Sequence, residues 1–140
     1  MEDRPAGGGV CRPAAEGAVI LLDTHAVIWM TKRHKRARLL EQYPRLHLSP
    51  ASLLEVQFLV ESNRIRLAHD SPVMELVNDP RWRLDEPPAA NWCLTACQFG
   101  WTRDPFDRLL AAHARLRGWK LATADSVLLQ NLSPLDVLPL

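Results

Sequence analysis

The chain has 140 residues, a length that indicates one domain rather than two. Its residues are 47% hydrophobic and 24% charged, the ordinary composition of a globular protein. This composition excludes a mostly disordered chain, a collagen-like chain and a disulfide scaffold. No apolar run reaches the length of about 18 residues that a membrane span needs. The 17 Lys and Arg residues nearly balance the 16 Asp and Glu residues. The net charge of +1 therefore gives no information about a nucleic-acid partner.

The beginning of the chain differs in composition from the rest, because four of the six glycines lie within its first 17 residues. We expect residues 1–17 to form a disordered tail and residues 18–140 to form the folded domain. The tail has acids and prolines where a signal peptide needs an apolar core, so we expect a cytoplasmic protein. In a reducing cytoplasm Cys11, Cys93 and Cys97 would be thiols, and we expect these side chains to be buried.

In the first half of the domain, the apolar run at residues 18–22 predicts a strand that is covered on both faces. A Ser-Pro pair at residues 49–50 predicts a helix start, because Ser can cap a helix and Pro fits its first turn. The helix that follows is apolar nearly all round, so we expect it to be deeply packed. The other elements expected here are a helix over 24–30, a basic helical segment over 32–42, and a strand over 46–48, before the helix over 50–62.

In the second half, Pro and Gly residues mark the ends of helices. Asp104 and Pro105 predict a helix start, and Gly118 predicts the end of the same helix. The elements expected are helices over 73–77, 88–99, 105–117 and 126–131, and strands over 82–84, 119–123 and 136–140. Strands that alternate with helices predict an α/β fold, in which helices flank a parallel sheet on both faces.

Acidic residues follow the predicted strands. Asp23 comes directly after the first strand, Asp125 comes two residues after Thr123, and Asp104 precedes a helix. The carboxyl ends of parallel strands meet at one edge of the sheet, where binding sites form. Glu55 lies in an apolar helix, where an ionised carboxylate needs a cation, a metal or hydrogen bonds. Each acid also has a structural interpretation, as a helix cap for the three Asp residues and as an edge residue reaching solvent for Glu55.

Convergence of these carboxylates at one edge would require a compensating positive charge. Two carboxylates about 5 Å apart repel each other by roughly 3 kcal/mol at an effective dielectric constant of about 20. A divalent cation would remove this repulsion, and ligands that are all oxygen favour Mg²⁺ or Mn²⁺ over zinc. Elsewhere, residues 32–38 carry five cations and no acid, which predicts either a nucleic-acid contact or a solvated helix face.

Four segments resemble those of PIN-domain proteins and, more narrowly, those of the VapC-type toxins of bacterial toxin–antitoxin pairs. They are residues 22–26 (LDTHA), 52–55 (SLLE), 103–108 (RDPFDR) and 122–125 (ATAD). The resemblance covers about residues 19–140. It implies a single PIN-like domain with a parallel sheet between helices, and a metal-dependent endoribonuclease activity with Mg²⁺, or else Mn²⁺, as the cofactor.

The resemblance also implies roles for individual residues. The acids that match the catalytic and metal-binding positions of the family are Asp23, Glu55, Asp104 and Asp125, and Asp107 matches a further acid that contributes in many members. The residues expected to contact the substrate are Thr24 and Thr123, beside the acids, and Arg103 and Arg108. Arg108 lies four residues after Asp104, so it could instead pair with that carboxylate. Thr102 stands where family members commonly carry His.

The partners implied by the resemblance are an RNA substrate, a cognate antitoxin protein that covers the acidic site, and a second copy of the chain in a homodimer. The alternative function is a PIN-fold module that binds RNA or protein with little or no catalysis. A haloacid-type phosphatase would need a second Asp two residues after Asp23, where this chain has His25. A dinucleotide-binding fold would need a glycine-rich turn after the first strand, and residues 23–30 contain no Gly.

Overall fold

The structure is a computed structural model, and it describes residues 17–68 and 70–140. Within it, five strands form one parallel sheet in the order β3-β2-β1-β4-β5. The strands are β1 (Val19–Leu22), β2 (Arg45–Leu48), β3 (Arg83–Leu84), β4 (Lys120–Thr123) and β5 (Val137–Pro139). In the central strand β1, Ile20, Leu21 and Leu22 have no solvent exposure, which confirms the predicted strand covered on both faces.

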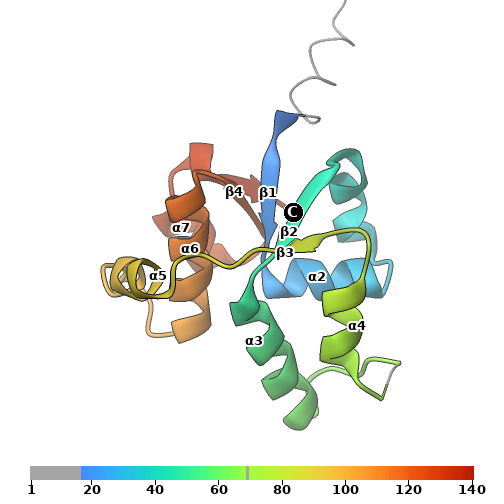
Figure 1. The fold of residues 1–140 in the computed structure, drawn as a ribbon. Helices are drawn as coiled ribbons and strands as arrows, with labels where there is room; N and C mark the ends of the chain where they lie inside the picture. The colour runs from blue at the N-terminus through green and yellow to red at the C-terminus, as the bar shows by residue number, and fades with distance from the viewer. Residues whose placement is uncertain (1–16, 69) are drawn as a thin grey trace, which may run out of the picture.

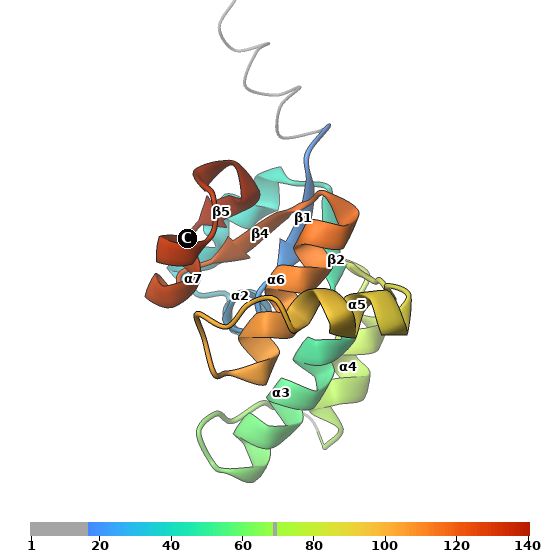
Figure 2. The ribbon, with the colours of Figure 1, turned by 90° about the vertical axis from the view of Figure 1, so that its left-hand side faces the viewer.

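Helices pack on both faces of this sheet, so the predicted α/β architecture is confirmed (Figures 1 and 2). The helices are α2 (Thr24–Thr31), α3 (Pro50–Glu61), α4 (Pro72–Asn78), α5 (Ala89–Ala96), α6 (Pro105–Arg117) and α7 (Ser126–Asn131), with the 3₁₀ segments η1 (Lys35–Gln42) and η2 (Pro134–Asp136). Successive residues of β1 alternate between two cores. Ile20 and Leu22 pack with α2, η1, α3 and α4, whereas Leu21 packs with α5, α6 and α7.

The predicted ends of the helices follow from hydrogen bonds at their caps. The Ser49 hydroxyl accepts the backbone N–H of Ala51 at the start of α3, at 3.2 Å. Asp104 and Asp125 cap α6 and α7 in the same way. Gly118 ends α6 with a φ of 70°, the left-handed conformation that Gly adopts without a steric penalty. The sequence therefore predicted these boundaries through the chemistry of the caps.

The prediction that α3 is deeply packed is wrong. Leu54 and Phe58 on this helix are 53% and 52% exposed, and its buried residues are Ala51, Ser52 and Val56. Figure 1 shows the physical reason, because most of α3 extends beyond the edge of the sheet, where no strand covers it. An apolar helix surface is therefore open to solvent beside the ends of the strands.

Two further expectations fail in or beside α5. Cys93 and Cys97 are exposed, so the prediction that they are buried is wrong. The helix also ends at Ala96, short of the predicted residue 99. Ala96 is the one residue of α5 that is buried, since this helix lies against α6 on the outside of the molecule (Figure 2). The basic helical segment likewise begins later than predicted, at Lys35, and is a 3₁₀ helix.

The predicted tail, apart from Gly17, lies outside the residues that the structure describes, as does Cys11. Within the described ranges, every helix is too short or too polar to cross a membrane.

Candidate active site

The acids singled out in the sequence lie together at the carboxyl-terminal edge of the sheet. Asp23 follows β1, Asp125 comes two residues after the end of β4, Asp104 and Asp107 lie at the start of α6, and Glu55 lies on α3. The charges of the other four acids all act on Asp107 and raise its pKa. The fold therefore brings these carboxylates into one electrostatic cluster, hereafter the acidic cluster, from segments up to a hundred residues apart in the sequence.

Asp23 is the most buried member of the acidic cluster, with 4% of its surface exposed. One carboxylate oxygen accepts the backbone N–H of Thr24 at 2.6 Å, and the other accepts the hydroxyl of Thr123 at 2.7 Å. Burial raises the pKa of Asp23, while the hydrogen bond from Thr123 opposes this rise. The same Thr123 oxygen accepts the backbone N–H of Asp125 at 3.0 Å, so it links two acids of the cluster.

Asp104 and Asp125 each divide their two carboxylate oxygens between two environments. Oδ1 of Asp104 accepts the backbone N–H groups of Phe106 and Asp107, at 2.8 and 3.3 Å. Oδ1 of Asp125 accepts those of the second and third residues after it, at 2.9 and 3.0 Å. Among the described residues, neither Oδ2 atom has a hydrogen-bond donor, so these oxygens are available to a ligand.

Asp107 has the most perturbed environment of the five. Its pKa rises to about 7, first because it is partly buried and then because Asp104 and the other acids repel its charge. A carboxyl group in this position is half protonated near neutral pH. A positive charge bound among the acids would reverse this effect and lower the pKa.

Glu55 presents a buried oxygen without a hydrogen bond. Its Oε1 atom is inaccessible to solvent and lacks a partner among the described residues. Burial raises the pKa of Glu55, Thr24 opposes the rise, and the charges of Asp23 and Asp104 add to it. An unsatisfied carboxylate oxygen in a protein interior is unusual and calls for a physical explanation.

These observations fit a hard divalent cation. The donors are all carboxylate and hydroxyl oxygens, which Mg²⁺ and Mn²⁺ prefer. The unpartnered oxygen of Glu55 and the raised pKa of Asp107 both indicate too little positive charge at this place. In the part of the chain that the structure describes, no three or more His, Cys, Asp or Glu side chains are already arranged to hold a metal ion. A metal ion held by three or more of these carboxylates would require them to move closer together.

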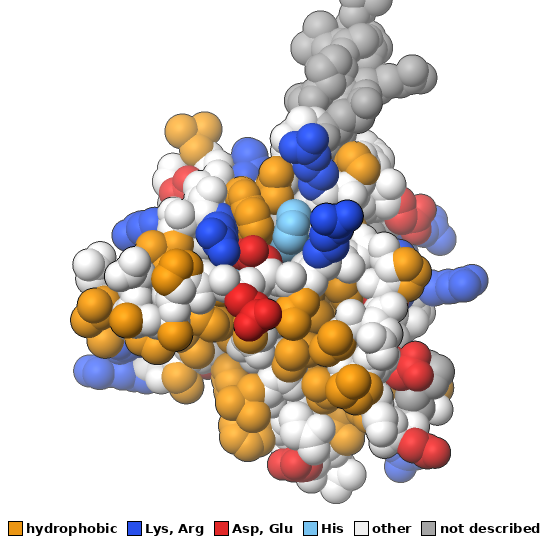
Figure 3. Space-filling model, viewed as in Figure 1, with side chains coloured by type: hydrophobic (Ala, Val, Ile, Leu, Met, Phe, Trp, Pro, Cys, Tyr) orange, Lys and Arg blue, Asp and Glu red, His pale blue; other side chains and the backbone are white. Residues whose placement is uncertain are grey.

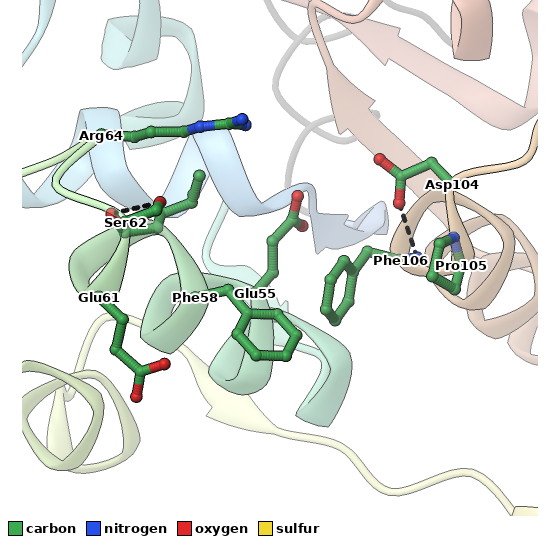
Figure 4. Close-up of a pocket in the computed structure, with 9 residues that line it drawn as sticks. Glu55, Phe58, Glu61, Ser62, Arg64, Asp104, Pro105 and Phe106 are labelled. Atoms are coloured by element: carbon green, nitrogen blue, oxygen red, sulfur yellow. Dashed lines mark hydrogen bonds between the residues drawn. The ribbon is translucent and has the colours of Figure 1, made fainter.

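A cavity of about 680 Å³ opens beside the acidic cluster, between α3 and the start of α6. Figure 4 shows Glu55 and Asp104 on opposite sides of it, with the Phe106 ring between them, the Phe58 ring below Glu55, and Arg64 at its rim. The two phenyl rings meet edge to face, with their centres 5.8 Å apart. The cavity thus combines carboxylates with exposed aromatic surface, as ligand sites commonly do.

A comparison with known protein families identifies the family to which this fold belongs. The PIN domain family matches residues 20–132, which include every acid of the cluster. The chain belongs to the PIN domain family. The predicted resemblance is therefore confirmed at the level of the family and of the fold.

Individual proteins similar to this PIN domain share less than a third of its sequence. The chain is 29% identical over 125 residues to "Ribonuclease VapC22" of Mycobacterium tuberculosis (strain ATCC 25618 / H37Rv), an alignment that covers 84% of this chain and 95% of that protein. Its structure is similar to a toxin–antitoxin complex from Klebsiella pneumoniae, with a TM-score of 0.64, 17% identity, and coverage of 85% of this chain and 95% of the other. It is also similar to DNA-bound VapBC from Salmonella typhimurium, with a TM-score of 0.60, 21% identity, and coverage of 87% and 98%.

The residues predicted to contact a substrate lie near the acidic cluster but differ in their surroundings. Thr24 is buried, and its hydroxyl is 2.9 Å from that of Ser52. Arg108 donates from Nε to the backbone oxygen of Thr102 at 2.8 Å, so part of its guanidinium holds the loop before α6 of this PIN domain. Arg103 is exposed. Their roles toward a substrate stay predictions.

The aromatic wall of the cavity was not predicted from the sequence. In the sequence, Phe58 was predicted to be an apolar residue of a buried helix, and Phe106 was predicted to lie at the start of a helix. A phenylalanine three residues after Glu55, on the same helix, would have indicated that aromatic surface adjoins the acid. The partner across the gap cannot be inferred in this way, because α3 and α6 are brought together only by the fold.

Proposed function

We propose that this PIN domain is a divalent-metal-dependent endoribonuclease that acts as the toxin of a toxin–antitoxin pair. The observation that carries this proposal is the acidic cluster, in which five carboxylates converge and one buried Glu55 oxygen has no partner among the described residues. The similarity to a protein named as a ribonuclease, VapC22, supports the same activity. The structural likeness to toxin–antitoxin complexes supports the fold that such a toxin would need.

In this proposal the Oδ2 atoms of Asp104 and Asp125, which accept no hydrogen bond from the described residues, would hold the metal ion together with Asp23. Asp107 would be a further ligand, directly or through water. A Mg²⁺ or Mn²⁺ ion bound there would polarise the scissile phosphate and lower the pKa of an attacking water. Thr123 and the α2 backbone fix the orientation of the Asp23 carboxylate through two hydrogen bonds. Glu55 lines the cavity beside these acids and would be a further ligand or the base that orients the attacking water.

The cavity between α3 and α6 supports a protein partner of particular chemistry. Its walls combine Glu55 and Asp104 with Phe58 and Phe106, so it is complementary to a segment that presents an Arg or Lys beside apolar side chains. An antitoxin bound in this way would place a cation among the acids and exclude both metal and RNA. We also propose that the protein is cytoplasmic and that it forms a homodimer. Sedimentation velocity would test the homodimer.

The experiment that tests the activity compares the wild type with Asp104→Asn. Asn still accepts the backbone N–H groups at the start of α6, so this variant keeps the helix cap and loses only the charge. We expect Mg²⁺ or Mn²⁺ to raise the melting temperature of the wild type and to support cleavage of structured RNA. Asp104→Asn should lose both effects. Asp136→Asn, a change of an exposed acid on η2, is the matched control and should retain both.

Two results would contradict the proposal in different ways. If divalent ions leave the melting temperature and the cleavage of the wild type unchanged, the metal site is wrong. If Asp104→Asn cleaves RNA as the wild type does, the activity lies elsewhere. RNA binding without cleavage would favour a non-catalytic PIN module.

The toxin role requires a test in cells. Expression of the wild type should slow the growth of a bacterial host, whereas Asp104→Asn should not. Co-expression of the protein encoded beside this chain should restore growth, if it is the antitoxin. Equal growth with both variants would contradict the toxin role and would leave the biochemical assay of cleavage to be judged independently.

A further inference from the structure

A second cavity of about 560 Å³ lies at the end of α6 away from the acidic cluster. The residues that matter there are Arg45 and His47 on β2, Arg83 on β3, and Trp119 directly after Gly118. Helix α6 runs from the acidic cluster to this cavity, and its 13 residues span about 20 Å. The cavity, hereafter the β2–β3 pocket, is therefore separate from the candidate active site.

The β2–β3 pocket exists because helices cover this face of the sheet unevenly. The core beneath α5, α6 and α7 includes residues of β1, β4 and β5. On β2, Leu46 and Leu48 face the opposite core, so Arg45 and His47 point to the side of α6. The strand register places Arg83 directly beside His47 and on the same face. On the face drawn in Figure 3, Lys or Arg, His and acidic side chains lie close together beside apolar surface.

The β2–β3 pocket carries positive charge that no other described residue neutralises. Arg45 and Arg83 are exposed, and within the described residues neither forms an ion pair. Arg81, which also lines the cavity, differs because Asp79 holds it at 2.7 Å. The nearby carboxylate of Asp85 is bound by Arg117 and His113, at 2.8 and 2.7 Å, and is thus compensated. An anion would therefore find two free guanidinium groups here.

The same pocket holds an aromatic surface with an unsatisfied nitrogen. The His47 ring stacks on Trp119, with 4.4 Å between the ring centres and 29° between their planes. Nδ1 of His47 is buried and lacks a hydrogen-bond partner among the described residues. A purely structural role would explain the stacking of His47. It would not explain a buried polar atom that is left without a partner, which costs free energy.

We propose that the β2–β3 pocket binds a nucleoside phosphate, with the phosphate held by Arg45 and Arg83 and the base packed against the rings of His47 and Trp119. Arginine forms paired hydrogen bonds with phosphate, and bases stack on aromatic side chains in a manner that tolerates any base. The group that binds is either a nucleotide unit of an RNA chain or a free nucleotide. In the first case the inference rests on the proposed function, because it adds a second contact for the RNA substrate.

The test measures binding by calorimetry in EDTA, where a metal ion cannot occupy the acidic cluster. The probes are AMP, adenosine, inorganic phosphate and a six-residue adenylate, and the protein is the full chain. We expect AMP to bind the wild type, and Arg83→Ala or Arg45→Ala to weaken it at least fivefold. Arg66→Ala removes an equally exposed charge outside the pocket and should change the affinity less than twofold. Thermal melts of each variant establish that it is folded.

A second readout locates the bound nucleotide. The indole N–H resonance of Trp119, assigned with Trp119→Phe, should shift on addition of AMP to the wild type and should not shift in Arg83→Ala. Tighter binding of the adenylate than of AMP, by tenfold or more, identifies RNA as the source. Equal affinities identify a free nucleotide, and both outcomes support the pocket.

Three results would overturn the inference. These are no binding of AMP or the adenylate, equal binding by the wild type and Arg83→Ala, and binding of inorganic phosphate as tight as that of AMP. Because these measurements need neither metal nor cleavage, they are independent of the RNA cleavage assay. An inactive protein that binds AMP would refute the proposed function alone, and an active protein that does not would refute this inference alone.

Discussion

The acidic cluster predicts that replacing one of its members makes the metal-free protein more stable. Asp107 is the clearest case, because its pKa lies at about 7 instead of 3.8. In the unfolded chain this carboxyl group ionises near its ordinary pKa, whereas the fold resists its ionisation. Folding is therefore penalised as the pH rises from about 4 to 7, and the penalty is complete above pH 7. Asp107→Asn removes the ionisable group and with it the penalty.

The size of the effect follows from the shift. A rise of roughly 3 pKa units corresponds to about 4 kcal/mol. Asp107 is only partly buried, so water screens part of the repulsion, and we take about half of this value. A gain of about 2 kcal/mol raises the melting temperature of a domain of this length by about 6 °C.

The assay is thermal unfolding of the wild type and Asp107→Asn in EDTA, at pH 8 and at pH 4. The variant should melt about 6 °C higher at pH 8, and most of the difference should disappear at pH 4, where the carboxyl group is protonated in the folded state and about half protonated in the unfolded chain. Asp136→Asn, which lies outside the cluster, should show little difference at either pH. An Asp107→Asn variant that is less stable than the wild type at pH 8, or equally stabilised at both pH values, would refute the reasoning.

Three other substitutions test how individual residues contribute to the stability of the fold and of the site. The buried His113 ring has a pKa lowered by desolvation, so wild-type stability should fall as the pH drops below about 6.5, and urea melts of His113→Gln should lack this dependence. Gly118→Ala should cost about 1 kcal/mol in thermal melts, because Ala is strained at a φ of 70°, and no loss would contradict that cause. Thr123→Val removes the hydroxyl that donates to buried Asp23, so it should lower the free energy of unfolding by about 1–3 kcal/mol at pH 7, measured in urea. An unchanged free energy of unfolding would show that this hydrogen bond does not contribute to stability.

Much of the acidic cluster could be predicted because it follows from local sequence. Asp23 and Asp125 come after apolar strands, and parallel strands end at a shared edge. Asp104 is followed by Pro105, and this pair predicts the start of a helix with Asp104 as its cap. Glu55 stands out because a charge in an apolar helix needs a reason. Each of these inferences requires only the neighbours of a residue along the chain.

What could not be predicted depends on contacts between distant segments. An apolar helix such as α3 shows how much surface it could bury, but not how much surface the fold offers to cover it. Phe58 is exposed because α3 extends beyond the sheet, and Cys93 is exposed because α5 has a neighbour on one side only. The β2–β3 pocket is a further case, since Arg83 adjoins His47 only through the register of two strands.

The double use of the carboxylates of Asp104 and Asp125 limits which residues evolution can place there. Capping a helix with one oxygen accepts Asn, Ser or Thr as well as Asp, but not the longer Glu side chain. Supplying a negative charge with the other oxygen accepts only an acid. Asp alone meets both demands, so a single change to Asn, Ser or Thr yields a chain that folds normally and lacks a charge. Under the proposed function, such a variant would be a stable protein that does not cleave RNA.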